Sequence, residues 1–93
     1  MELTITHDAV AQQFSAIVEG KQSFISYEIS PDKKVLDFYS TFVPPELRGR
    51  HIGDTLVKHA LEYAKDHQQK VIPSCPFVQH YIDRHPDYLA IVF

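Results

Sequence analysis

The first half of the chain alternates apolar and polar residues, which is the period of a half-buried β-strand. The alternation begins at Leu3 and Ile5 and is interrupted by turn-forming residues at Gly20 and over 30–34. Because strands joined by short turns pair antiparallel, we expect a meander. Its main strands are predicted at residues 14–19, 24–29 and 35–43.

The period changes to about 3.6 residues after Ile52, which predicts an amphipathic helix of about four turns. The apolar run at 70–73 then lies where a right-handed crossover returns a strand parallel to the one ending at Val43. Short helices are expected over 77–82 and 86–91. The predicted fold class is therefore mixed α/β (α+β), with a largely antiparallel sheet, one parallel βαβ unit and short C-terminal helices.

Length and composition restrict the classes of function. A chain of 93 residues is expected to form one domain over 1–93. Its net charge of −3, without a long basic run, argues against nucleic acid as a partner. No apolar run approaches the roughly 18 residues that a membrane helix needs.

The distribution of cysteine and histidine adds two expectations. The single Cys75 cannot form an internal disulfide, and the first eight residues lack the features of a secretion signal, so we expect a cytoplasmic setting. The six histidines fall on different predicted elements, without the spacing of a zinc motif. We therefore expect no metal site.

The junction at residues 43–53 leads from an apolar strand into the predicted helix through a glycine-containing loop. In such a loop, consecutive backbone N–H groups converge beside the positive end of the helix dipole, where an anion is stabilised. A pyrophosphate matches this arrangement. The alternative is that Pro44 and Pro45, with a glycine near the helix start, only make a sharp turn.

The same junction resembles a known cofactor signature. Its pattern Val-x-Pro-x-x-Arg-Gly-x-Gly-x-Gly is similar to that of the GNAT superfamily of acetyl-CoA-dependent N-acyltransferases, with His51 in place of the middle glycine. The short length, Pro-x-Cys-Pro-Phe at 73–77 and Tyr-Ile-x-Arg-His-Pro at 81–86 resemble the minimal, single-domain group called YjdJ-type. The resemblance implies that acetyl-CoA contacts Val43, Arg48, Gly49, Arg50, His51, Ile52, Gly53 and Asp54.

Two further residues are candidates for catalysis. The resemblance implies that Tyr81, on the helix after the second parallel strand, is the general acid that protonates the departing thiolate; a tyrosine packed in the core is the alternative. Cys75 lies between two prolines near the predicted cofactor site, where its thiol could react with the acyl group. A lone cysteine is also commonly a small buried apolar residue.

The resemblance also bears on the acceptor. Fuller members of the superfamily carry two helices between the first and second strands, and residues 7–13 leave no room for them. The acceptor side should therefore be open, which fits a large amine acceptor such as a protein, a wall donated by another subunit of a homo-oligomer, or no acceptor at all.

We therefore expect an acetyl-CoA-binding N-acetyltransferase in which an amine attacks the thioester directly. The alternatives are a non-catalytic acyl-CoA-binding or sensing module and a protein-interaction domain with a vestigial pocket.

Overall fold

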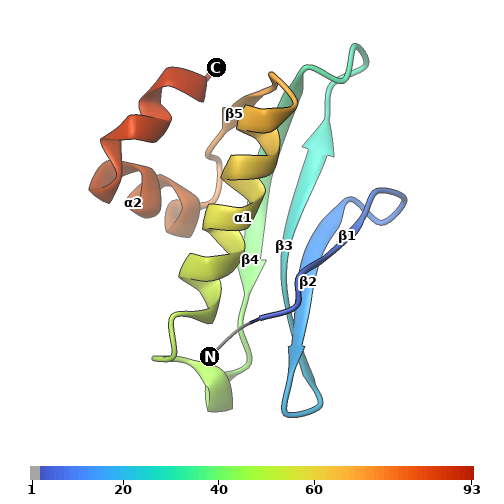
Figure 1. The fold of residues 1–93 in the computed structure, drawn as a ribbon, viewed down its shortest axis with the longest axis vertical. Helices are drawn as coiled ribbons and strands as arrows, with labels where there is room; N and C mark the ends of the chain where they lie inside the picture. Colours follow the sequence, from blue (N-terminus) through green and yellow to red (C-terminus); the bar gives the residue numbers. More distant parts are fainter. Residues whose placement is uncertain (1–2) are drawn as a thin grey trace.

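Five strands form one sheet in the order β1-β2-β3-β4-β5 in this computed structural model, which describes residues 3–93 (Figure 1). Residues 1 and 2, which the expected domain includes, lie outside the described chain. Neighbouring strands from β1 to β4 pair antiparallel, which confirms the predicted meander. The strands are β1 (Thr6–Asp8), β2 (Gln13–Val18), β3 (Lys21–Ile29), β4 (Val35–Phe42) and β5 (Lys70–Ile72).

The predicted βαβ unit is also present. The helix α1 (Ile52–Asp66) connects β4 to β5, and these two strands pair in parallel. The connection between β4 and α1 contains a short 3-10 helix, η1 (Pro45–Leu47), which the sequence pattern did not predict. Proline favours this start, because its fixed φ suits the first position of a helical turn, which Pro45 occupies, and the burial of Leu47 holds the turn against the core.

The parallel pairing of β4 with β5 is short. It covers three residue pairs and ends where Asp37 lies opposite Ile72. The chain beyond β5 then makes one more contact, in which the Cys75 amide donates to the Phe38 carbonyl at 2.9 Å. Past Phe38, β4 has no strand beside it on this side within the described residues, so the backbone of its last residues is available to another partner.

On its other side, where it pairs with β3, β4 contains an irregularity close to Phe38. Ser40 pairs with Ser26, but Tyr27 pairs with Phe38, so Tyr39 is the extra residue of a β-bulge. A bulge bends its strand and increases the local twist. The last residues of β4 are therefore turned relative to the three that pair with β5.

A single apolar core lies between the sheet and its helices. In Figure 1, α1 covers one face of the sheet, and α2 (Pro76–Arg84) lies beside α1. The strand residues that alternate with the core positions point to the other face, where Ile17 is 71% exposed. The largest fully buried side chains are Phe14, Phe38, Ile25, Leu36, Leu47, Ile52, Leu56, Leu61, Ile82, Val57, Val71 and Val78.

The C-terminal segment folds back onto β5. The second helix predicted there is the 3-10 helix η2 (Pro86–Ile91). After it, Val92 forms a parallel bridge with Val71, and the Phe93 amide donates to the Val71 carbonyl at 2.9 Å. Within residues 3–93, none of the helices has the length and apolar character needed to cross a membrane.

The N-terminal strand is held by a cluster of aromatic and histidine side chains. His7 Nε2 lies 2.6 Å from the Tyr27 hydroxyl, and its ring stacks on Phe14 with centroids 4.2 Å apart. Burial lowers the pKa of His7, and the nearby His59 and His67 lower it further, whereas Asp8 opposes the change. The folded chain therefore favours the neutral ring.

We expect acid to weaken this cluster. A lowered folded pKa means that the unfolded chain binds the proton more tightly, so the stability contributed by neutral His7 is complete above about pH 6.5 and is lost as the pH falls below it. Urea unfolding at about pH 7.5 and about pH 5.5 measures this difference. The difference in the free energy of unfolding between the two pH values should shrink in His7→Phe. It should persist in His80→Asn, which changes an exposed histidine on α2. An equal difference in wild type and His7→Phe would contradict the assignment.

Candidate functional site

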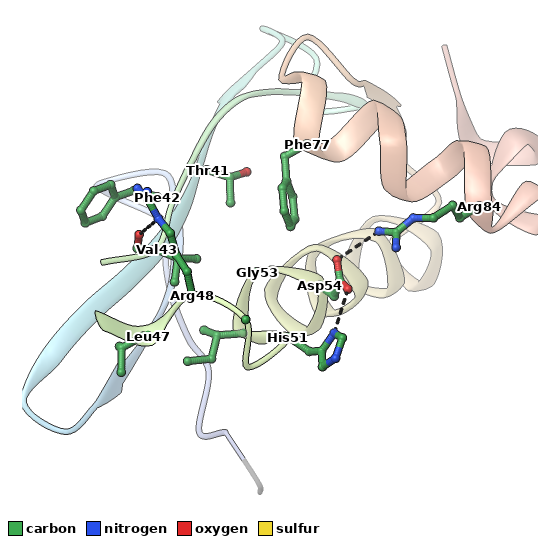
Figure 2. A pocket seen from close by; sticks show the side chains of 12 residues that line it. Thr41, Phe42, Val43, Leu47, Arg48, His51, Gly53, Asp54, Phe77 and Arg84 are labelled. Carbon is green, nitrogen blue, oxygen red and sulfur yellow. Dashed lines mark hydrogen bonds and ion pairs between the residues drawn. The ribbon is translucent and has the colours of Figure 1, made fainter. Parts of the chain in front are cut away.

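A pocket of about 500 Å³ lies where the end of β4 faces the start of α1 (Figure 2). Every residue of the predicted cofactor site except Arg50 lines it. The pocket also receives two side chains from α2. Its lining residues are Thr41, Phe42, Val43, Leu47, Arg48, Gly49, His51, Ile52, Gly53, Asp54, Phe77 and Arg84.

The loop between η1 and α1 has an unusual backbone. Gly49 and His51 both adopt left-handed conformations, with φ of 86° and 62°. Glycine adopts this conformation freely, and histidine does so more readily than most residues. His51 thus takes the backbone conformation that a glycine in its place would allow, and it precedes the first residue of α1.

The first turn of α1, whose residues line the pocket, has free amide groups. The first bond of the helix joins the Thr55 amide to the His51 carbonyl at 3.0 Å. Among the described residues, the amides of Ile52, Gly53 and Asp54 have no hydrogen-bond acceptor, and no side chain caps the helix. Unpaired N–H groups at the positive end of a helix dipole stabilise an anion.

The charged side of the pocket is organised around Asp54. Its carboxylate accepts a hydrogen bond from Arg84 Nη2 at 3.2 Å, and His51 Nδ1 lies 3.5 Å from its other oxygen (Figure 2). Arg84 was not among the residues expected at the site, because it comes from α2, 30 residues further along the chain. No local pattern indicates this contact.

Two arginines brace the loop from outside the helix. Arg48 Nε donates to the Val43 carbonyl at 3.0 Å, which connects the loop to the end of β4. Arg50 forms an ion pair with Glu19 in the turn between β2 and β3, so its side chain leaves the pocket. Arg50 stays a predicted cofactor-site residue through its backbone amide, since only its guanidinium is paired with Glu19.

Gly53 differs from the glycine at position 49. It lies inside α1 and has no positive φ, so backbone freedom does not explain it. A Cβ built on Gly53 would lie 2.7 Å from the tip of the Phe77 ring. Phe77 comes from the first turn of α2 and is 39% exposed; its place in the pocket was not anticipated from the sequence.

Cys75 lies next to the pocket without lining it. It occupies the N-cap position of α2 and is 7% exposed. Its thiol lies 3.6 Å from the hydroxyl of Thr41, a residue of the pocket wall, and donates to it. One side chain thus separates the sulfur from the space.

Tyr81 lies in a different place. It is 5% exposed and lines a second cavity of about 390 Å³ between α1, α2 and η2, together with Arg84. Burial raises the pKa of Tyr81, and the Asp54 carboxylate raises it further. Its hydroxyl has no hydrogen-bond partner in the part of the chain that the structure describes, so a protonated phenol is available there. The structure does not bring Tyr81 and Cys75 into the lining of the first pocket.

The fold and this site define the class of protein. Residues 13–92 match the family model of the GCN5-related N-acetyl-transferases, and the chain belongs to this family. The match includes the whole of the loop, α1 and α2. The fold expected from the resemblance is therefore confirmed.

Similar proteins agree with this assignment. Protein NATD1 of Danio rerio is 32% identical over 91 residues, which cover 94% of this chain and 82% of that protein. Protein NATD1 of Mus musculus is 30% identical over 86 residues, which cover 90% and 77%. The solution structure of a GCN5-like protein from Staphylococcus aureus has a TM-score of 0.75 at 25% identity, covering 98% of this chain and 88% of that one.

The left-handed glycine in the loop can be tested by stability. In Gly49→Ala the new Cβ meets no atom within 4 Å, so the cost comes from the positive φ alone. We expect a loss of about 1 kcal/mol, because the left-handed backbone costs a non-glycine residue about 1–2 kcal/mol and the stiffer unfolded chain offsets part of it.

Gly20→Ala is the matched variant, since Gly20 has a φ of 75° and equally open surroundings. Gly20 lies in the β2–β3 turn, which does not line the pocket, although its neighbour Glu19 pairs with Arg50. Urea unfolding should give similar losses for the two variants. An unchanged stability of Gly49→Ala would show that the loop is not held in this conformation.

Proposed function

We propose that the chain binds acetyl-CoA and transfers its acetyl group to an amine. The observation that carries this proposal is the set of free amides at the start of α1, whose residues line a pocket beside the end of β4, where β4 has no partner strand on the β5 side within residues 3–93. Family membership supports the same donor, since GCN5-related N-acetyltransferases generally use acetyl-CoA. The cofactor supplies an acetyl group activated as a thioester.

The residues present fit this cofactor. The amides of Ile52, Gly53 and Asp54 would hold its pyrophosphate, because they are unpaired and lie at the positive end of α1. The pantetheine arm carries amide groups, and the last residues of β4 offer backbone hydrogen-bonding groups that no strand occupies on the β5 side within residues 3–93. Thr41 lies on this edge, next to Cys75.

Binding is the first test. We expect calorimetry to detect binding of acetyl-CoA and of CoA to the wild type. Gly49→Ala should weaken binding at least tenfold, or about 1.4 kcal/mol, because the strained loop no longer directs the amides into the pocket. Gly20→Ala, with a similar loss of stability, should bind normally. His51→Gly should keep or improve the affinity, since the left-handed conformation is retained without strain.

The chemistry that we propose is direct attack of the amine on the thioester. Tyr81 is proposed as the general acid for the departing thiolate; its raised pKa keeps it protonated at neutral pH. Cys75 is proposed to contribute packing near the acyl group. No enzyme nucleophile is needed for direct attack.

Two variants distinguish the direct route from one through an acetylated cysteine. We expect Tyr81→Phe to lower kcat by roughly 100-fold while acetyl-CoA affinity stays nearly unchanged, because a general acid acts chiefly in the transition state. Cys75→Ala should lower kcat much less. Thioester consumption with a panel of amines measures both.

The opposite pattern would overturn the direct route. An inactive Cys75→Ala, together with an acetyl adduct on Cys75 detected by mass spectrometry, would make Cys75 the nucleophile. A Tyr81→Phe variant with normal kcat would remove Tyr81 from the reaction.

A second candidate function is a non-catalytic acyl-CoA-binding module. It is favoured by one observation, that neither Cys75 nor Tyr81 lines the pocket that carries the free amides. This function requires tight binding of acetyl-CoA with no thioester consumption for any amine offered. Turnover above the rate without protein would exclude it.

A further inference from the structure

The contact between Phe77 and Gly53 joins the two helices at the pocket. The tip of the ring occupies the space that a side chain at position 53 would fill, with Cζ 2.7 Å and Cε1 3.1 Å from an ideal Cβ. Real Cβ atoms do not approach other carbons so closely, so any side chain at this position must displace the ring. The absence of a side chain at Gly53 is thus matched to the presence of Phe77.

The ring also stands inside the space that a ligand would use. Figure 2 shows Phe77 reaching from α2 into the region between Thr41 on β4 and Gly53 on α1, and all three residues line the pocket. A large apolar ring that is 39% exposed within a pocket gains stability when an apolar group of a ligand covers it.

The pocket has a polar side at the start of α1 and a less polar side at the end of β4. Phe77 lies on the less polar side. The free amides, His51 and the Asp54–Arg84 pair lie at the start of α1. Thr41 and Phe42 lie at the end of β4. A ligand with phosphates at the amides and an arm directed along β4 has to pass the Phe77 ring.

We propose that Phe77 is a positioning residue that holds the apolar arm of the ligand against β4, and that Gly53 lacks a side chain so that the ring can take this position. The arm is the pantetheine chain, so this inference rests on the proposed function. A side chain at position 53 acts by pushing the ring into the path of the arm. The phosphates, held by backbone amides, are affected little.

A comparison of two ligands distinguishes the contribution of the pantetheine arm to affinity from that of the phosphates. CoA has both, whereas adenosine 3′-phosphate 5′-diphosphate is CoA without its pantetheine arm. By calorimetry, we expect Phe77→Ala to weaken CoA about tenfold and to leave the nucleotide within about twofold of wild type. Phe77→Leu, which keeps an apolar wall, should recover part of the CoA affinity. A merely structural role of the ring would change both ligands together.

A double-mutant cycle tests the link to Gly53. Gly53→Ala in the wild type should weaken CoA about tenfold, because the methyl group displaces the ring, and should change the urea midpoint little, because the lost ring contact offsets the gain in helix propensity. In the Phe77→Ala background the same substitution should leave CoA affinity unchanged and raise the midpoint, because alanine is the better helix former once the ring is gone. The urea midpoint should therefore rise more in the Phe77→Ala background than in the wild type.

Other outcomes overturn the inference. Equal weakening of both ligands by Gly53→Ala in both backgrounds would show that the glycine serves close approach of the phosphates instead. Unchanged CoA affinity in Phe77→Ala would remove the ring from the arm's path. If the wild type binds neither ligand, the proposed function fails and the positioning role fails with it. If the wild type binds both and Phe77→Ala does not discriminate, only the positioning role fails.

Discussion

The early end of the β4–β5 pairing is the constraint on which the site depends. The two strands share three residue pairs, and Pro73 then follows β5 without an N–H group to continue the ladder. The chain turns into α2 through Cys75, which makes one last bond to Phe38. Because the parallel pairing is brief, the end of β4 and the start of α1 face an open space instead of a neighbouring strand.

The loop beside that space is held in a strained conformation by contacts outside it. The two residues with left-handed backbone, Gly49 and His51, flank Arg50 in the sequence. Arg50 is paired with Glu19 and Arg48 is bonded to the Val43 carbonyl, so the loop is fixed both to the neighbouring hairpin and to β4. Fixing these torsions before a ligand arrives reduces the ordering cost of binding. The free amides of α1 are thus preorganised.

The elements set by local sequence patterns could be predicted, and those set by tertiary contact could not. Alternation and the helical period predicted the meander and α1, and the prolines and glycines at 43–53 predicted the loop between them. The roles of Arg84 and Phe77 depend on how α2 packs against α1, which no spacing encodes. Gly53 shows the limit most clearly, because the glycine pattern marked it only as a cofactor-site residue, whereas the packing of α2 shows that it leaves room for the Phe77 ring.

The bridge between Val71 and Val92 has a consequence for association between chains. A strand at the end of a sheet exposes backbone groups that can pair with a strand of another molecule. Here the chain covers the outer side of β5 itself, and the Val71 carbonyl already accepts a hydrogen bond from the Phe93 amide. Edge-to-edge extension of the sheet through β5 is blocked, so this side of the molecule is protected against the kind of pairing that leads to aggregation.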